Sequence, residues 1–188
     1  MISQVHFSEQ LAIQRLLKCF NMTFSRTHFT ILEGGGEEPV YHPAQYPYKK
    51  ARIVFTRNYF SSALHEIAHW CIAGCLRRAR VDYGYWYQPD GRDPQQQASF
   101  EQVEIKPQAL EWIFSVASGI RFRVSADNLN LNLDASDHFK AAILFQAHEY
   151  CHNGLPQRAQ IFLAALTTEF NTAELNPLAT KHYCVSRI

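Results

Sequence analysis

A chain of 188 residues, 47% hydrophobic and 19% charged, is long enough to bury a core, and we expect one domain over residues 1–188. A net charge of +1 gives no reason to expect a nucleic acid or an anionic membrane as partner, and no apolar run approaches the roughly 20 residues that span a bilayer. Five cysteines without a CxxC pair, and an N-terminus without a signal-peptide pattern, predict a cytoplasmic protein with free thiols.

The hydrophobic pattern predicts an α+β fold, in which about five helices pack against a small mixed or antiparallel sheet. Strand-like stretches occupy residues 28–32, 52–56 and 81–87. The glycine-rich residues 33–39 are expected to form a connecting loop, and residues 176–188 an irregular tail. The expected helices are one that Ser8 caps, followed by 61–80, 98–118, 137–152 and 156–170.

The predicted helix over residues 61–80 carries the motif His65-Glu66-Ile67-Ala68-His69. Residues four apart lie one turn apart on a helix, so His65 and His69 can direct two imidazoles at one metal ion. Glu66 is turned toward the adjacent side. The apolar residues of the helix form a stripe with both histidines at its border, which predicts a partly enclosed metal site. The basic residues 77–80 fit the C-terminal end of the helix, where cations oppose the helix dipole.

A third ligand is expected from the helix over residues 98–118. Glu104 lies at the border of the apolar face of that helix, next to the irregularity that Pro107 introduces by starting a new helix or kinking a continuous one. Glu101 and Glu111 are the competing candidates. We expect the metal between this helix and the one that carries the two histidines.

A second motif of the same form, His148-Glu149-Tyr150-Cys151-His152, occurs later in the chain. Residues 153–156, Asn-Gly-Leu-Pro, follow it directly and predict the end of the helix. His152 would then lie in the last turn, where the helix dipole already explains a histidine. We therefore expect the metal at the first motif.

Two histidines and one carboxylate permit two kinds of chemistry. With zinc, they leave a position for water, and Glu66 acts as general base of a metallopeptidase in a zincin-like arrangement. With iron(II), the same set leaves positions for dioxygen and substrate, as in an oxygenase. A structural metal site would need a fourth protein ligand at a sensible spacing, and the sequence offers none.

Three segments of the chain resemble the bacterial elongation factor P hydroxylase family. They are residues 62–74 around the first motif, the aromatic and turn segment 81–93, and residues 100–110. The resemblance continues more loosely from about residue 8 to residue 175. It implies a cytoplasmic enzyme that hydroxylates the modified lysine of elongation factor P after a β-lysyl group has been attached.

The resemblance also implies a metal held by His65, His69 and Glu104, and it does not include the second histidine pair. We expect iron(II), with zinc or another divalent metal as the alternative. We expect Glu66 to orient a metal-bound water or a group that contacts a metal ligand. Because the modified lysine carries two positive charges, we expect Tyr85, Tyr87 and Asp90 to line the entrance for it. The alternative function is a zinc metallopeptidase of the HExxH plus glutamate type.

Overall fold

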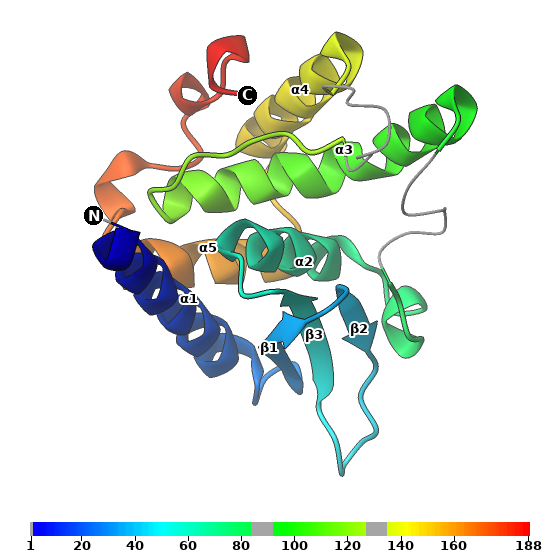
Figure 1. Ribbon diagram of the computed structural model, residues 1–188, viewed down its shortest axis with the longest axis vertical. Coiled ribbons are helices and arrows are strands. Elements are labelled where there is room, and N and C mark those ends of the chain that lie inside the picture. The colour runs from blue at the N-terminus through cyan, green and yellow to red at the C-terminus, as the bar shows by residue number, and fades with distance from the viewer. Residues whose placement is uncertain (1, 84–91, 127–134) are drawn as a thin grey trace.

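The computed structural model describes residues 2–83, 92–126 and 135–188, with side chains from Glu9 onward (Figure 1). In this part of the chain, five α-helices and one three-stranded mixed sheet form an α+β fold, as predicted. The elements are α1 (Ile2–Phe24), β1 (Thr30–Gly36), β2 (Val40–His42), β3 (Ala51–Thr56), α2 (Phe60–Ile72), α3 (Pro94–Ala117), α4 (Asp137–Asn153) and α5 (Gln157–Glu169).

The sheet has the order β1-β3-β2, with β3 in the centre. β3 runs parallel to β1 and antiparallel to β2. Its alternate residues Ala51, Ile53 and Phe55 are buried in the core, as expected for a strand with one covered face. Of the predicted strand over residues 81–87, Asp82 forms an isolated antiparallel bridge with Tyr41, and residues 84–87 lie outside the described part.

The expected glycine-rich loop over residues 33–39 is wrong in its first half. β1 continues through the glycines to Gly36, and its pairing with β3 is irregular between Glu33 and Gly36. Gly35 has a φ of 83°, a backbone conformation that side chains with a Cβ rarely adopt. The glycines therefore provide a bulged strand end rather than a free connector.

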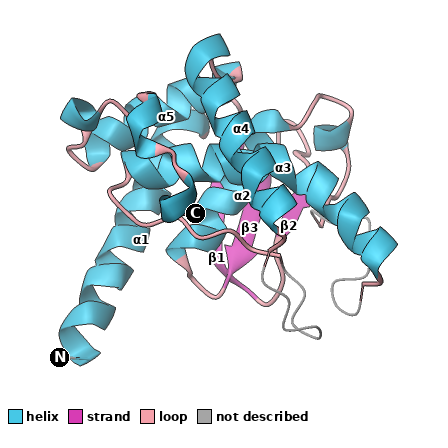
Figure 2. Ribbon diagram, turned by 90° about the horizontal axis from the view of Figure 1, so that it is seen from above, coloured by secondary structure: helices cyan, strands magenta, loops and turns pink. Residues whose placement is uncertain are grey.

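The helices are stacked on one side of the sheet, and this stacking determines where the metal-site motif lies. α2 lies between the sheet and α3, and α3 in turn packs against α4 (Figure 1). The view from above shows the strands partly hidden behind the helices labelled α2 and α3 (Figure 2). A cluster of aromatic rings joins α1, α2 and α5. Phe20 and Phe24 of α1 each contact Trp70 of α2 and Phe162 of α5, with ring centroids 4.8–6.2 Å apart. α2 is thus held on several sides.

Three of the predicted helix boundaries differ from the structure. α1 begins at Ile2, so Ser8 lies inside that helix and does not cap it. α2 ends at Ile72 and not at Arg80; after it, Arg77–Ala79 form a separate 3-10 turn. α3 begins at Pro94, earlier than predicted, because Asp93 and Gln96 form a capping box around a proline in the first turn.

The predictions for the C-terminal half agree better with the structure. α4 and α5 lie within one residue of the predicted ranges 137–152 and 156–170. Pro107 lies inside one continuous α3, which decides between the two alternatives for that residue. The tail contains only short 3-10 turns, yet Tyr183 is buried and packs edge-on against Trp112. A single domain over the whole chain stays a prediction.

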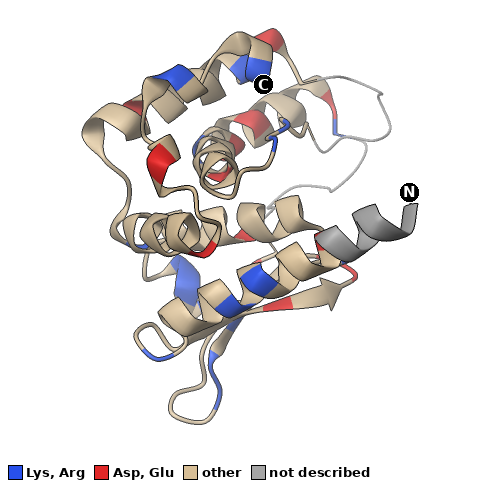
Figure 3. Cartoon of the chain, turned by 90° about the vertical axis from the view of Figure 1, so that its left-hand side faces the viewer, with Lys and Arg blue, Asp and Glu red and all other residues tan. Residues whose placement is uncertain are grey.

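Two surface properties bear on possible partners. Lys and Arg residues are interspersed with Asp and Glu residues along the chain, which agrees with a net charge of +1 (Figure 3). No helix in the described residues is long and apolar enough to cross a membrane.

Candidate metal centre

The two histidines of the first motif meet at one face of α2. The apolar residues Leu64, Ile67, Ala68 and Cys71 bury the other side of this helix in the core. His65 Nε2 lies 3.0 Å from His69 Nε2, and the two side chains are 25% and 11% exposed. Both imidazoles therefore present the same nitrogen to one point in a largely enclosed space.

The third side chain at this point is Glu104 of α3. Its carboxylate lies 3.4 Å from His65 Nε2 through Oε2 and 3.2 Å from His69 Nε2 through Oε1. Oε2 is buried and accepts no hydrogen bond from the residues that the structure describes. The structure thus brings together the three residues that were predicted as ligands, and in the described residues they are the one such group of at least three His, Cys, Asp or Glu side chains.

Glu111, a competing candidate for third ligand, takes a different place. Its Oε2 lies 2.9 Å from Nδ1 of His65, on the side of the ring opposite to Nε2. The other candidate, Glu101, accepts hydrogen bonds from Ser136 and Gln97, away from the histidines. Glu104 is therefore the carboxylate that faces both Nε2 atoms.

Burial and neighbouring charges shift the pKa values of these groups in opposite directions. Burial acts to lower the pKa of His65, but Glu104 and Glu111 outweigh it and raise the pKa to about 10. Burial acts to raise the pKa of Glu104, but His69 and His65 outweigh it and lower the pKa to about 2. Burial raises the pKa of Glu66 and of Glu111. In the absence of a metal, the lowered pKa of Glu104 favours its carboxylate form, and the raised pKa of His65 favours its protonated ring.

The three ligand candidates fit a small divalent cation. Two ligands at about 2.1 Å from a metal are about 3.0–3.4 Å apart at octahedral or tetrahedral angles. The two Nε2 atoms are 3.0 Å apart, and each lies 3.2 or 3.4 Å from a different oxygen of the Glu104 carboxylate. A cation would also supply the missing partner of Glu104 Oε2 and offset the carboxylates that are buried together. The donor set of two imidazoles and one carboxylate suits iron and zinc alike.

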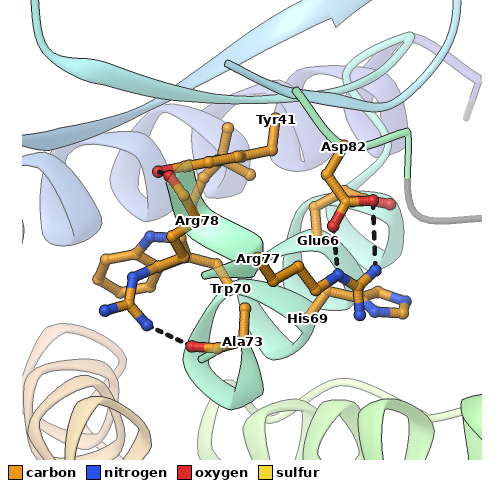
Figure 4. A pocket seen from close by; sticks show the side chains of 9 residues that line it. Tyr41, Glu66, His69, Trp70, Ala73, Arg77, Arg78 and Asp82 are labelled. Atoms are coloured by element: carbon orange, nitrogen blue, oxygen red, sulfur yellow. Dashed lines mark hydrogen bonds and ion pairs between the residues drawn. The ribbon is translucent and has the colours of Figure 1, made fainter. Parts of the chain in front are cut away.

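A pocket lies beside the centre, on the side of His69 and Glu66. It is also lined by Tyr41 of β2, Trp70 of α2 and the segment that follows α2. Figure 4 shows Glu66, His69, Arg77 and Asp82 on one side of this pocket, and Tyr41, Trp70 and Arg78 on the other. Arg77 donates to both carboxylate oxygens of Asp82. Of the three ligand candidates, His69 is the one that lines this pocket.

The C-terminal end of α2 is capped by arginines in a way that differs from the prediction. Arg158 of α5 donates through Nη2 to the backbone oxygens of Trp70, Cys71 and Ala73, at 2.9, 3.0 and 2.6 Å. Arg78 also donates to the Ala73 oxygen. Of the basic residues 77–80, only Arg78 makes such a capping bond in the described residues, and it does so from outside the helix.

The second histidine motif has other contacts. His148 Nε2 contacts the backbone oxygen of Tyr183 in the tail, and His152 Nδ1 contacts the backbone oxygen of His148. Neither histidine belongs to a group of metal-ligand candidates in the described residues. This agrees with the expectation that the metal site lies at the first motif and not at the second, which lies at a helix end.

Some predicted site residues lie outside the described residues, and some residues at the site were not found by the sequence analysis. The predicted substrate contacts Tyr85, Tyr87 and Asp90 lie outside the described residues. The sequence analysis did not find Tyr41 and Trp70 at the pocket, and it considered Glu111 only as a metal ligand. The seven-residue spacing of Glu104 and Glu111 was the available signal, since it places both on one face of α3.

The fold and the cluster define an α+β protein with a buried centre of two histidines and one glutamate, a donor set found in metal-dependent oxygenases and hydrolases. The family model described as elongation factor P hydroxylase matches residues 19–180. The chain is also 46% identical over 162 residues to the elongation factor P lysine hydroxylase of Haemophilus influenzae, which covers 86% of this chain and 91% of that protein. The chain therefore belongs to the elongation factor P hydroxylase family. These comparisons do not support the alternative of a zinc metallopeptidase.

Proposed function

We propose that this protein hydroxylates a lysine of elongation factor P that already carries a β-lysyl group, and that it uses a divalent metal, iron(II), for this reaction. The observation that carries the proposal is the convergence of His65, His69 and Glu104 in a chain of this family. A bound iron(II) would supply the activation of dioxygen. The protein's own residues bind the metal, admit the substrate and limit the access of water.

In this proposal, His65 and His69 bind through Nε2, and Glu104 binds through its carboxylate. Three protein ligands on one side leave the remaining coordination positions for dioxygen and for the substrate. The stack of α2 between the sheet and α3 keeps the ligands in place, because both helices bury their apolar residues in the core. The ligands are therefore organised before a metal binds.

The substrate lysine would approach through the pocket beside His69. A modified lysine is long and flexible, so it can reach an enclosed centre from the surface of a folded protein. Trp70 and His69 line the pocket, and Nε1 of Trp70 and Nδ1 of His69 are buried without a hydrogen-bond partner in the described residues. Glu66 also lines the pocket, where its carboxylate can orient the substrate amine. Tyr85, Tyr87 and Asp90 follow Asp82 in the chain, and we keep them as proposed contacts at the entrance.

Intact-protein mass spectrometry tests this function. β-lysylated elongation factor P is incubated with the protein, iron(II), a reductant and air. The expected result is a gain of the mass of one oxygen atom, which is absent without air and absent with the His65→Ala variant. Glu149→Gln, in the second motif, is the matched control and should leave the gain unchanged. No mass gain with the wild-type protein, or an equal gain with His65→Ala, would contradict the proposal.

A further inference from the structure

Two carboxylates of α3 face the two different nitrogens of the His65 ring. Glu104 and Glu111 are seven residues apart, so they lie on one face of the helix, two turns from each other. Glu104 faces Nε2 of His65 at 3.4 Å, and Glu111 faces Nδ1 at 2.9 Å. The imidazole of His65 is thus held between them.

The contact of Glu111 determines which nitrogen of His65 can bind a metal. A neutral imidazole carries its proton on one nitrogen and offers a lone pair on the other. If Nδ1–H donates to Glu111, the lone pair is on Nε2, and Nε2 points at His69 Nε2 and Glu104. Glu111 is 7% exposed, so water competes little for its carboxylate. The hydrogen bond therefore selects both the tautomer and the orientation of the ring.

The second histidine lacks such a partner. Nδ1 of His69 is buried and makes no hydrogen bond in the described residues. No other acidic residue of α3 takes this role either, since Glu101 accepts from Ser136 at 3.0 Å. The two histidines are therefore supported differently, and a loss of Glu111 should act through His65.

We propose that Glu111 is a positioning residue: it holds His65 as the Nδ1–H tautomer and so presents Nε2 to the divalent metal. This inference rests on the proposed function in that it requires a metal at His65, His69 and Glu104. Carboxylates that accept from a metal-binding histidine typically change metal affinity about 10–100-fold when removed. Glu111 itself is not a ligand, because its carboxylate lies at the opposite nitrogen.

The test measures the zinc(II) affinity of the metal-free protein by competition with a chromophoric chelator. Glu111→Ala should weaken binding about 10–100-fold. Glu111→Gln should weaken it less, because an amide oxygen still accepts from Nδ1–H but carries no charge. Glu101→Gln is the matched control on the same helix and should bind zinc(II) as the wild type does.

A second readout follows the histidine directly. In the zinc-loaded wild type, ¹⁵N NMR should show a proton on Nδ1 of His65 that exchanges slowly with water, and Glu111→Ala should make that exchange faster. If Glu111→Ala does not fold, as circular dichroism would show, the comparison of Glu111→Gln with Glu101→Gln decides. Wild-type zinc affinity and wild-type exchange of the Nδ1 proton in the folded Glu111 variants would overturn the proposal.

These results are distinguishable from a failure of the proposed function. If zinc binding depends on Glu111 but elongation factor P gains no oxygen, the positioning role stands and the substrate assignment fails. If the wild-type protein binds no zinc(II), cobalt(II) or iron(II), the metal centre is wrong, and this inference is overturned with it.

Discussion

Replacement of Arg158 by methionine tests whether the end of the metal-site helix depends on α5. The guanidinium caps the last turn of α2 by donating through Nη2 to three backbone oxygens, and its Cζ lies 4.9 Å from the centroid of the Trp70 ring. Methionine keeps an unbranched apolar side chain over this ring, so the change removes mainly the hydrogen bonds and the charge.

The magnitude follows from the geometry. Nη2 has two N–H groups, so it satisfies two of the three oxygens at a time, at about 1–1.5 kcal/mol each. The cation–π contact adds about 0.5–1 kcal/mol. Because Arg158 is partly exposed and water can reach some of these oxygens after the change, we expect a loss of about 2–3 kcal/mol in the free energy of unfolding. For a chain of this size, this corresponds to a fall of about 4–12 °C in Tm.

The assay is urea and thermal unfolding of the metal-free protein, followed by circular dichroism. Arg123→Met is the matched control, because Arg123 is exposed, and it should stay within about 0.5 kcal/mol of the wild type. If Arg158→Met also stays within about 0.5 kcal/mol of the wild type, the reasoning about the end of α2 is refuted.

Three further predictions concern the centre and the sheet. His65→Ala and Glu104→Ala should each weaken zinc(II) binding, measured by chelator competition, by more than the roughly 100-fold effect of removing a residue that only hydrogen-bonds to a ligand. Weaker zinc(II) binding by His148→Ala would instead place the site at the second motif. The metal-free protein should lose stability as the pH rises from 6.5 to about 10, because the raised pKa of His65 stabilises the folded state while the ring is protonated; Tm measured against pH should fall less steeply for His65→Gln, and equal slopes would contradict this. Gly36→Ala should destabilise the protein by about 1–3 kcal/mol in urea unfolding, because a Cβ there would meet neighbouring atoms at 2.7 and 2.8 Å, while at Gly74 it would meet none within 4 Å; an equal effect of Gly74→Ala would count against this account.

The proposed chemistry also explains why polar groups remain buried without partners near the first motif. A buried polar atom without a hydrogen bond costs free energy unless a ligand satisfies it. Three of the four such side-chain atoms in the described residues belong to His69, Trp70 and Glu104, which form or adjoin the centre. Their concentration is what a site for a metal and a polar substrate requires.

Local sequence was sufficient wherever neighbours along the chain determine the structure. The period of apolar residues predicted α4 and α5 closely, because helix formation and helix ends depend on residues within a few turns. The spacing of His65 and His69 predicted that two imidazoles converge, since four residues make about one turn. The α+β class and a small sheet followed from the same patterns, which left open whether the sheet was mixed or antiparallel.

Contacts between distant residues decided the rest. The glycine at position 74 is a local signal for the end of α2 at Ile72, but the predicted helix ran past it to Arg80. Arg158 of α5 caps the observed end from more than 80 residues away. The parallel pairing of β1 with β3 depends on the path of the chain between them and not on either strand alone. The pocket likewise combines β2, α2 and the segment after α2.

The roles of Glu104 and Glu111 show this division most clearly. The seven-residue spacing places both on one face of a helix, and the sequence analysis expected Glu104 as the third ligand with Glu111 as a competing candidate. Only the position of α3 along α2 distinguishes them, because it puts Glu104 opposite both Nε2 atoms and Glu111 opposite Nδ1 of His65. Residue types and their period thus predicted which chemistry the chain can support, while the packing of two helices decided which carboxylate faces the metal and which holds its ligand.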